Sequence, residues 1–428
     1  MEWRRIEEVE LNERDRAVLA GEFGPAAAMA MRIVTRMGAI ARAPRLINVS
    51  HAHIDSSIYV GDAGLEFAER LAGLGAQVVV PSSLNVSGVD EHHWQEWPVA
   101  PEWASKAHRQ MVAYRAMGCT ETWTCAPYQT LARPSFGQQI AWGESNAIVF
   151  ANSVIGARTE RYPDLYDICA AITGRVPEVG LHTDDGRRGE ILITLANVPH
   201  HLQERDEFYP VLGFLLGRLA EDHIPVVEGL SVHPTDDQLK ALGASAASSG
   251  AVALFHLVGI TPEAPTAADA FGGRAPIATH TVGMAELNDA RAQLTTSDDA
   301  PVDLVLLGSP HFSVAEFRQL APLLKGRRKA DSVEFLVTTS RIMRALAAES
   351  GMLNDLEAFG GRLTVDTCVL ATPMLPASIK TIMTNSGKYA YYVPGLLDRQ
   401  VVYGSLADCV ESAQRGRVIR DDSAWRPS

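Results

Sequence analysis

The chain has 428 residues, of which 46% are hydrophobic and 21% are charged, and its formal net charge is −13. This length and composition predict an ordinary globular protein of two or three domains, and the acidic balance argues against a nucleic-acid partner, because phosphate contacts need basic side chains. No apolar run reaches the ~18 residues of a membrane helix, the N-terminus lacks the apolar core of a secretory signal, and five scattered cysteines make no disulfide framework. We therefore expect a reduced, cytoplasmic protein without a membrane anchor.

The N-terminal region begins with two predicted helices, and strands then alternate with helices. Asn12 is suited to cap the first helix, which ends at Gly21. In chain order, a strand, a polar loop, a helix, a strand and a polar loop are expected over residues 46–49, 50–57, 63–74, 77–80 and 82–85. This alternation is the doubly wound α/β pattern, which places both polar loops at the same edge of a parallel sheet.

The middle of the chain gives fewer signals. Strands are expected over residues 121–124, 226–227 and 251–258. The first of them leads directly to Cys125, and the Gly-, Ala- and Pro-rich run 259–276 is expected to be a long loop. We assign residues 1–295 to an N-terminal and middle α/β region of one or two subdomains.

From Thr296 onward the pattern is regular and predicts a C-terminal α/β domain over residues 296–428. Strands are expected over residues 302–307, 333–337, 363–365, 380–383 and 400–403. The first four of these strands each end in a polar loop. Because ligands bind beyond the carboxyl ends of the strands in open α/β sheets, this row of loops predicts a site.

Two of these loops carry chemically useful groups. Cys368 follows the third strand, whereas Asn385, Ser386 and Lys388 follow the fourth. A thiol, an amide, a hydroxyl and an ammonium are what the walls of a binding crevice would offer. The alternatives are that Cys368 is a small buried residue and that the Thr-Asn-Ser run is an ordinary helix cap.

The cysteines divide into two groups. Cys125 and Cys368 both lie at the ends of predicted strands, where thiolates from separate loops can meet and hold an iron–sulfur cluster. Cys119, Cys169 and Cys409 fall within or beside predicted helices and are expected to be buried.

The sequence offers weaker signals for other chemistries. His51 and His53 stand two residues apart at a strand end, which favours two imidazoles on one side and leaves a zinc-dependent hydrolase on an (α/β) barrel as an alternative. The chain has no Gly-x-Ser-x-Gly elbow. It also has no phosphate-binding Gly-x-Gly-x-x-Gly or Walker loop after a strand.

Ten ordered motifs resemble the large subunit of aconitase X, a divergent dehydratase branch of the aconitase superfamily. They are Leu19–Gly24, Ser50–Asp55, Ser83–Asn85, Thr124–Tyr128, Ala141–Ser145, Ala151–Thr159, Gly308–His311, Thr339–Arg341, Asp366–Cys368 and Thr384–Ala390. The resemblance implies several doubly wound three-layer α/β/α units around a central cleft, and a hydro-lyase that depends on an iron–sulfur cluster. It also implies a heterodimer with a separate small subunit that carries the swivelling domain, since no such segment is evident here.

One position departs from the family pattern. Archaeal members usually have a third cysteine where this chain has Ser309, and a serine hydroxyl is a poorer iron ligand than a thiolate. With Cys125 and Cys368, this position favours a [2Fe–2S] cluster, and [3Fe–4S], [4Fe–4S] and mononuclear iron remain alternatives. The archaeal branch dehydrates mevalonate 5-phosphate and the bacterial branch dehydrates cis-3-hydroxy-L-proline. The missing cysteine and the lack of an evident basic phosphate cradle favour hydroxyproline.

The resemblance also suggests roles for individual residues. A serine alkoxide is the base in the wider superfamily, so Ser386 is a candidate, although the small subunit is an alternative source. The carboxylate and ring nitrogen of a small hydroxy acid are expected to be held by polar residues of the strand-end loops. These residues are Ser56, Ser57, Asn85, Asn385 and Lys388. His53 and Asp55 are expected to orient water or a ligand, and a non-catalytic scaffold is the remaining alternative.

Overall fold

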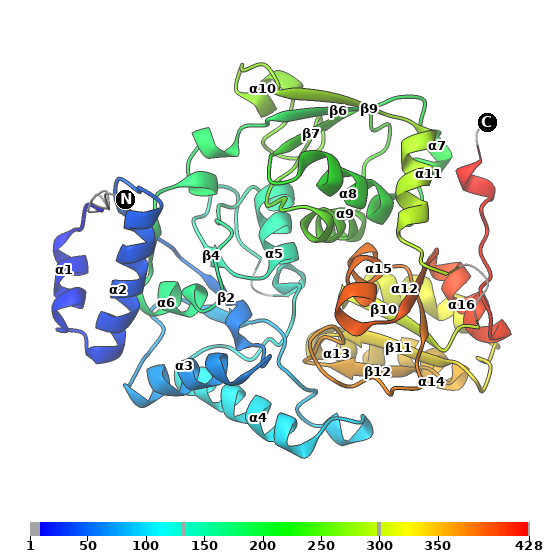
Figure 1. Ribbon diagram of the computed structural model, residues 1–428, viewed down its shortest axis with the longest axis horizontal. Coiled ribbons are helices and arrows are strands. Elements are labelled where there is room, and N and C mark those ends of the chain that lie inside the picture. The colour runs from blue at the N-terminus through cyan, green and yellow to red at the C-terminus, as the bar shows by residue number, and fades with distance from the viewer. Residues whose placement is uncertain (1–8, 131–132, 298–300, 427–428) are drawn as a thin grey trace. The chain divides into compact units, whose positions relative to one another are not determined.

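The computed structural model describes residues 9–130, 133–297 and 301–426, which form two compact units (Figure 1). The first unit comprises the residues up to Glu91 together with Ala100–Arg188. The second comprises His92–Val99 together with the residues from Gly189 onward. Within the described ranges, no helix is both long enough and apolar enough to cross a bilayer.

The first unit opens with the helical pair predicted from sequence. In chain order its helices and strands are α1 (Glu13–Ala20), α2 (Pro25–Ile40), β1 (Leu46–Asn48), β2 (Ala52–Ile54), α3 (Asp62–Gly73), β3 (Ser82–Leu84), α4 (Pro101–Ala116), β4 (Ala141–Trp142), α5 (Ser145–Phe150), α6 (Tyr166–Thr173) and β5 (Arg175–Pro177). Asn12 caps α1 as expected, because its side chain accepts a hydrogen bond from the Asp15 backbone N–H and the Asp15 carboxylate accepts one from the Asn12 backbone N–H.

The parallel sheet of this unit has the order β3–β2–β4, and its strands are not the ones that the sequence predicted. Residues 46–48 do form a strand, but β1 pairs antiparallel with β5 in a separate sheet. The predicted strand at 77–80 is absent, and the sheet uses Ala52–Ile54 and Ser82–Leu84, which were expected to be loops. These strands are short, wholly buried and rich in Ala, Ser and His, so their composition gave no strand signal.

The expected strand over residues 121–124 is also wrong. An isolated bridge between Ser83 and Thr120 lies just before this segment, and residues 121–124 form no strand. Cys125 therefore follows an irregular segment and precedes a short 3₁₀ turn, Pro127–Gln129.

The second unit begins with a four-stranded parallel sheet of order β8–β7–β6–β9. Its helices and strands are β6 (Ile191–Leu195), α7 (His200–Gln203), α8 (Phe208–Ala220), β7 (Pro225–Glu228), α9 (Asp236–Ser249), β8 (His256–Leu257), α10 (Ala267–Phe271), β9 (Ala278–Val282) and α11 (Met284–Gln293). Helices α8 and α9 pack together below this sheet in Figure 1. The strand predicted at 226–227 is confirmed, that at 251–258 shrinks to two residues, and the expected loop 259–276 contains α10.

The rest of the second unit is the regular α/β region that the sequence predicted. Its elements are β10 (Leu304–Phe312), α12 (Val314–Leu324), β11 (Glu334–Thr339), α13 (Arg341–Glu349), α14 (Met352–Phe359), β12 (Arg362–Val365), β13 (Thr381–Thr384), α15 (Gly387–Tyr392), β14 (Gln400–Tyr403) and α16 (Leu406–Arg415). All five strands are parallel, in the order β12–β11–β10–β13–β14. One detail differs, because β10 continues to Phe312 through residues 308–311, which were expected to be a loop, with a register shift after Leu307.

This strand order positions a site. The chain builds outward from β10 to β11 and β12, then returns to place β13 on the other side of β10. The crevice beyond such a reversal point is the usual ligand site of an open parallel sheet. Apolar residues of α12, α14 and α16 form the core with Val305, Val337 and their neighbours on one face of the sheet, while α9 and α15 also contact β10.

Candidate active site

Three polar residues stand where the parallel strands of the first unit end. Asp55 follows β2, Asn85 follows β3, and Glu144 lies two residues beyond β4. The pairing of Ile54 with Leu84 brings Asp55 and Asn85 side by side. The Asn85 side-chain amide donates a short hydrogen bond to Asp55 Oδ1, and the Asn85 backbone N–H donates to the Ile54 carbonyl oxygen at 3.0 Å.

A buried carboxylate on α6 fixes the turn that begins at Asp55. Asp167 Oδ2 accepts the backbone N–H groups of Asp55 and Ser56 at 2.6 and 2.9 Å, and Asp167 Oδ1 accepts the Ser56 hydroxyl at 2.6 Å. Burial raises the pKa of Asp167 although these donors oppose the shift. No alternation or motif in the sequence pointed to Asp167.

The acid at Asp55 is strongly perturbed. Burial raises its pKa to about 8, the carboxylates of Glu144 and Asp167 add to the rise, and the Asn85 amide opposes it. Asp55 therefore keeps its proton over much of the neutral range. Such a shift in a strand-end crevice is typical of groups that take part in binding or catalysis.

Ser56 and Ser57 have hydroxyls that are engaged inside the protein. The Ser56 hydroxyl donates to Asp167 and accepts from Tyr114 at 2.9 Å, whereas the Ser57 hydroxyl donates to the Ile54 carbonyl oxygen at 2.9 Å. Both serines are buried. They hold the turn beneath Asp55, and their contact with a substrate stays a prediction.

His53 and His51 flank Trp142. Burial, with a contribution from His51, lowers the pKa of His53 to about 3, and burial lowers that of His51 to about 4, so both imidazoles are neutral. Each Nδ1 has a partner: His53 lies 2.8 Å from Ser83 Oγ, and His51 accepts the Trp142 indole N–H at 3.0 Å. Among the residues with described positions, no group of three or more His, Cys, Asp or Glu is arranged to hold a metal ion.

The Cys125 loop is anchored to α5. The Asn146 side-chain amide donates to the Cys125 carbonyl oxygen at 2.7 Å and to Glu144, while Tyr128 donates its hydroxyl to Asn146 Oδ1 at 2.7 Å. Glu144 also caps α5 by accepting the Ala147 N–H at 2.7 Å. Cys125 itself is half-buried.

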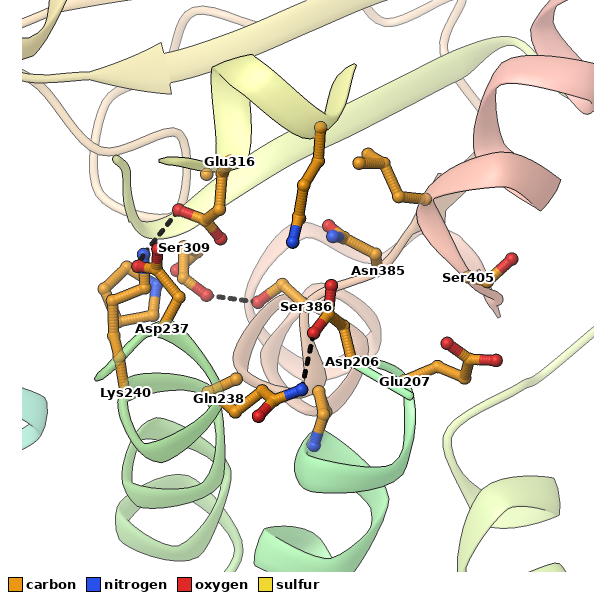
Figure 2. A pocket seen from close by; sticks show the side chains of 16 residues that line it. Asp206, Glu207, Asp237, Gln238, Lys240, Ser309, Glu316, Asn385, Ser386 and Ser405 are labelled. Carbon is orange, nitrogen blue, oxygen red and sulfur yellow. Dashed lines mark hydrogen bonds and ion pairs between the residues drawn. The ribbon is translucent and has the colours of Figure 1, made fainter. Parts of the chain in front are cut away.

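In the second unit, Ser309, Asn385 and Ser386 line one pocket of about 60 Å³ (Figure 2). Ser309 lies in the last part of β10, and the other two follow β13 across the point where the strand order reverses. Ser386 Oγ donates a short hydrogen bond to the Ser309 carbonyl oxygen and accepts the Tyr389 N–H at 3.1 Å. The helix-cap alternative is thus confirmed for Ser386, and its hydroxyl lines the pocket as well.

The same pocket is lined by a buried lysine between two acids (Figure 2). Lys240 on α9 is 2% exposed and forms ion pairs with Asp237, at 2.8 Å, and with Glu316 on α12. Burial lowers the pKa of Lys240, but the two carboxylates outweigh burial and raise it overall. Burial raises the pKa of Glu316 to about 7 against the opposing effect of Lys240.

Lys388 lies close enough to His311 to lower the pKa of its imidazole. His311 is buried and its Nε2 lies 3.1 Å from the Thr367 carbonyl oxygen. Burial lowers the pKa of His311 to about 4, and the ammonium groups of Lys240 and Lys388 contribute. Lys388 is half-buried on α15, two residues after Ser386 in the sequence.

The Cys368 turn is held by an ion pair. Asp366 has a left-handed backbone, with φ of 64°, and its buried carboxylate accepts two hydrogen bonds from Arg341, each of 2.7 Å. The Cys368 carbonyl oxygen accepts the N–H groups of Ala371 and Thr372 at 3.0 and 2.9 Å. Cys368 is half-buried, like Cys125 and unlike the three other cysteines, which are buried as predicted.

Comparison with known proteins identifies the family. Models of the aconitase X first, second and third domains match residues 8–185, 189–292 and 302–415. The chain belongs to the aconitase X family. The first of these boundaries coincides with the division between the two compact units, and the boundary expected at residues 295 and 296 lies between the second and third matches.

Aconitase X relatives with assigned activities are dehydratases. The chain is 48% identical to the cis-3-hydroxy-L-proline dehydratase of Pseudomonas aeruginosa over 97% of this chain and 72% of that protein. It is 37% identical to the phosphomevalonate dehydratase large subunit of Methanothermobacter thermautotrophicus, over 93% of this chain and 97% of that one. The crystal structure of Thermococcus kodakaraensis aconitase X in its holo-form matches with a TM-score of 0.84 and 32% identity, over 95% of this chain and 100% of that chain.

These findings confirm the α/β fold with several parallel sheets and the hydro-lyase family, and they leave the zinc hydrolase and the barrel without support. The name "large subunit" also implies that the family includes small-subunit partners. Sequence reasoning missed Asp167, Lys240 and Glu316. Asp55 and Glu144 stood inside recognised motifs, but their charge interactions depend on strand pairing.

Proposed function

We propose that this chain is the catalytic large subunit of an iron–sulfur-dependent hydro-lyase that converts cis-3-hydroxy-L-proline to Δ1-pyrroline-2-carboxylate and water. The observation that most supports this substrate is the acidic lining of the pocket that contains Ser386. Asp206, Glu207, Asp237 and Glu316 line it, and its lysine is already paired with two of them. Such a lining repels a phosphate group and tolerates a zwitterionic amino acid.

The donor chemistry of the cysteines fits an iron–sulfur cluster. Iron is bound by thiolates, and burial raises the pKa of Cys119, Cys169 and Cys409, which keeps these thiols protonated. Cys125 and Cys368, in contrast, are only half-buried. We assign them as ligands with Ser309 at the third position, and we favour a [2Fe–2S] cluster because only two thiolates are offered. The cluster, when bound, supplies Lewis acidity toward the departing hydroxyl group.

The protein side chains must then hold the substrate and move its protons. Lys388 and Asn385 are assigned to the substrate carboxylate, Asn385 as an amide donor that lines the pocket beside Ser386 and Lys388 as an ammonium on the first turn of α15. The base removes the C2 proton, the C3–O bond breaks, and the hydroxyl group takes a proton and leaves as water. The enamine formed then takes up a proton at C3 and loses its ring N–H proton as it becomes the cyclic imine. Ser386 is the candidate base, but its hydroxyl donates to Ser309, so it acts only after losing that proton. His53 is neutral and buried, and is assigned to orient water or a ligand.

The partner in this proposal is a small subunit that carries the swivelling domain, and together the two chains form a heterodimer in the cytoplasm. The support is the name of the archaeal relative, which is a large subunit that this chain matches over 97% of its length. An enzyme built in this way takes a small hydroxy acid as its substrate and needs neither nucleic acid nor membrane. The candidate small subunit should therefore be co-purified in every assay.

The decisive experiment measures iron, acid-labile sulfide and turnover on the anaerobically purified complex. We expect about two iron and two sulfide per chain and turnover of cis-3-hydroxy-L-proline. Cys125→Ala and Cys368→Ala should lose iron and roughly 1,000-fold or more in turnover, whereas Cys169→Ala and Cys409→Ala serve as matched controls that keep both. Dehydration of mevalonate 5-phosphate instead of hydroxyproline would contradict the substrate, and wild-type iron in Cys368→Ala would contradict the ligand set.

The same complex tests the base. Ser386→Ala should keep its iron and lose turnover, because it removes only the hydroxyl. Unchanged turnover in this variant would move the base to the small subunit.

A further inference from the structure

The end of β2 presents two hydrogen-bond acceptors next to each other. Asp55 is half-buried, and its Oδ1 already accepts the Asn85 amide group. Across the described part of the chain, no donor reaches Asn85 Oδ1, although Asn85 is only 3% exposed. Because the oxygen and nitrogen of a primary amide share one carbon, this unpaired oxygen lies beside the Asp55 carboxylate.

Burying an amide oxygen without a hydrogen-bond donor costs free energy unless a ligand or a water molecule donates to it. The charges around Asp55 make the same point. Besides burial and the Asn85 amide, the groups that shift the pKa of Asp55 most strongly are the carboxylates of Glu144, Asp167 and Asp164, all of which are negatively charged when ionised. The site is thus rich in acceptors and negative charge and calls for a ligand with positive charge and N–H donors.

We propose that Asp55 and Asn85 form the subsite for the ring ammonium of the substrate, an inference that rests on the function proposed above. A secondary ammonium in a five-membered ring has two N–H bonds. One N–H can donate a hydrogen bond to Asp55 Oδ2, and the other can donate to Asn85 Oδ1. The neutral cyclic imine of the product has no N–H bond, so both contacts are lost when the reaction is complete. This subsite selects cyclic amino acids against hydroxy acids that lack an amine.

The surroundings of the subsite fix the position of the carboxylate. Asp167 on α6 holds the backbone N–H of Asp55 at 2.6 Å, and Gly143 leaves room behind it, since a Cβ at Gly143 would lie 2.8 Å from the Asp55 Cβ. The Tyr114 hydroxyl on α4 supports the same turn by donating to the Ser56 carbonyl oxygen at 2.9 Å. The acceptor pair is therefore held in place before any ligand arrives, which reduces the ordering cost of binding.

Binding of a cation at this site has a proton signature. The free carboxyl has a pKa of about 8, raised by burial and by Glu144, Asp167 and Asp164, and an adjacent ammonium favours the ionised form. Ligand binding near pH 7 should therefore release up to about one proton to the buffer. A ligand without the ammonium should release none from Asp55.

The test uses the complex with its small subunit and two ligands that cannot be dehydrated. L-Proline has the ring ammonium and the carboxylate, and tetrahydrofuran-2-carboxylate has only the carboxylate. We expect wild type to bind proline roughly 30-fold or more tightly than the ether, and Asp55→Asn to bind the two within about 3-fold of each other. Asp62→Asn, which changes an acid on α3 that pairs with Lys106, is the matched control and should behave as wild type.

Calorimetry of wild type in buffers of different ionisation enthalpy provides a measurement that needs no variant. Proton release with proline and none with the ether supports the subsite, and equal release with both overturns it. An unchanged preference for proline in an Asp55→Asn complex that retains its iron would also overturn it, while hydroxyproline turnover by wild type would show that the proposed function stands. Absence of that turnover would instead overturn the proposed function.

Discussion

Two groups of acids in this protein differ because one of them is paired with a buried lysine. In the second unit, Asp237 and Glu316 share Lys240, which lowers the pKa of Asp237 overall and opposes the rise that burial causes at Glu316. In the first unit, Asp55 lies among other carboxylates and its pKa rises to about 8. An acid that is paired with a lysine already has its counter-charge, whereas an acid among acids is available for a ligand with positive charge.

The largest expected effect tests the paired group. Lys240→Met leaves two half-buried carboxylates without their cation, and breaking an ion pair whose lysine is buried costs up to about 3–5 kcal/mol. Urea denaturation of the complex should show this loss, and Lys325→Met, which changes an exposed lysine of the same unit, should show little change. Equal stability of the two variants would mean that the pairing of Lys240 is not what distinguishes the two acid groups.

Asp55→Asn tests the unpaired group through its dependence on pH. The folded-state pKa of Asp55 is raised above its unfolded value, so its contribution to stability is complete below about pH 4 and is lost as the pH rises through about 8. Replacing Asp55 with Asn removes that loss. The variant should therefore gain stability relative to wild type between pH 5 and pH 8, by on the order of 4 kcal/mol. A difference that stays constant over this range would contradict the raised pKa.

The smallest expected effect concerns the space behind Asp55. A Cβ at Gly143 would lie 2.8 Å from both the Asp55 Cβ and Asp167 Oδ2. Gly143→Ala should therefore cost about 1–3 kcal/mol through overpacking, and weaken proline binding without loss of iron. Gly73→Ala on α3 is the control, because nothing lies within 4 Å of the added carbon, and a gain of up to about 1 kcal/mol is expected there. If Gly143→Ala bound proline as tightly as wild type, the packing behind Asp55 would not determine ligand binding at the subsite.

The C-terminal strands and the N-terminal strands show where sequence reasoning succeeded and failed. Strands such as Glu334–Thr339 are apolar, β-branched and bounded by loops, so all five strands of that sheet were found. In the first unit, Ala52–Ile54 and Ser82–Leu84 are three residues each and carry Ala, Ser and His. They are strands because neighbouring segments pair with them and bury them, and no local pattern encodes that pairing.

The same distinction applies to the sites. Residue type and order in the sequence were enough to single out Cys125, Cys368, Ser386 and the family motifs, and to separate these two thiols from the three buried ones. The sequence could not predict that Lys240 lies between Asp237 and Glu316, or that Asp55 lies among carboxylates beside the unpaired oxygen of Asn85. Charge interactions and desolvation depend on distances that are set only when strands pair and helices pack, so the tertiary structure alone decided which acids are paired and which are left for a ligand.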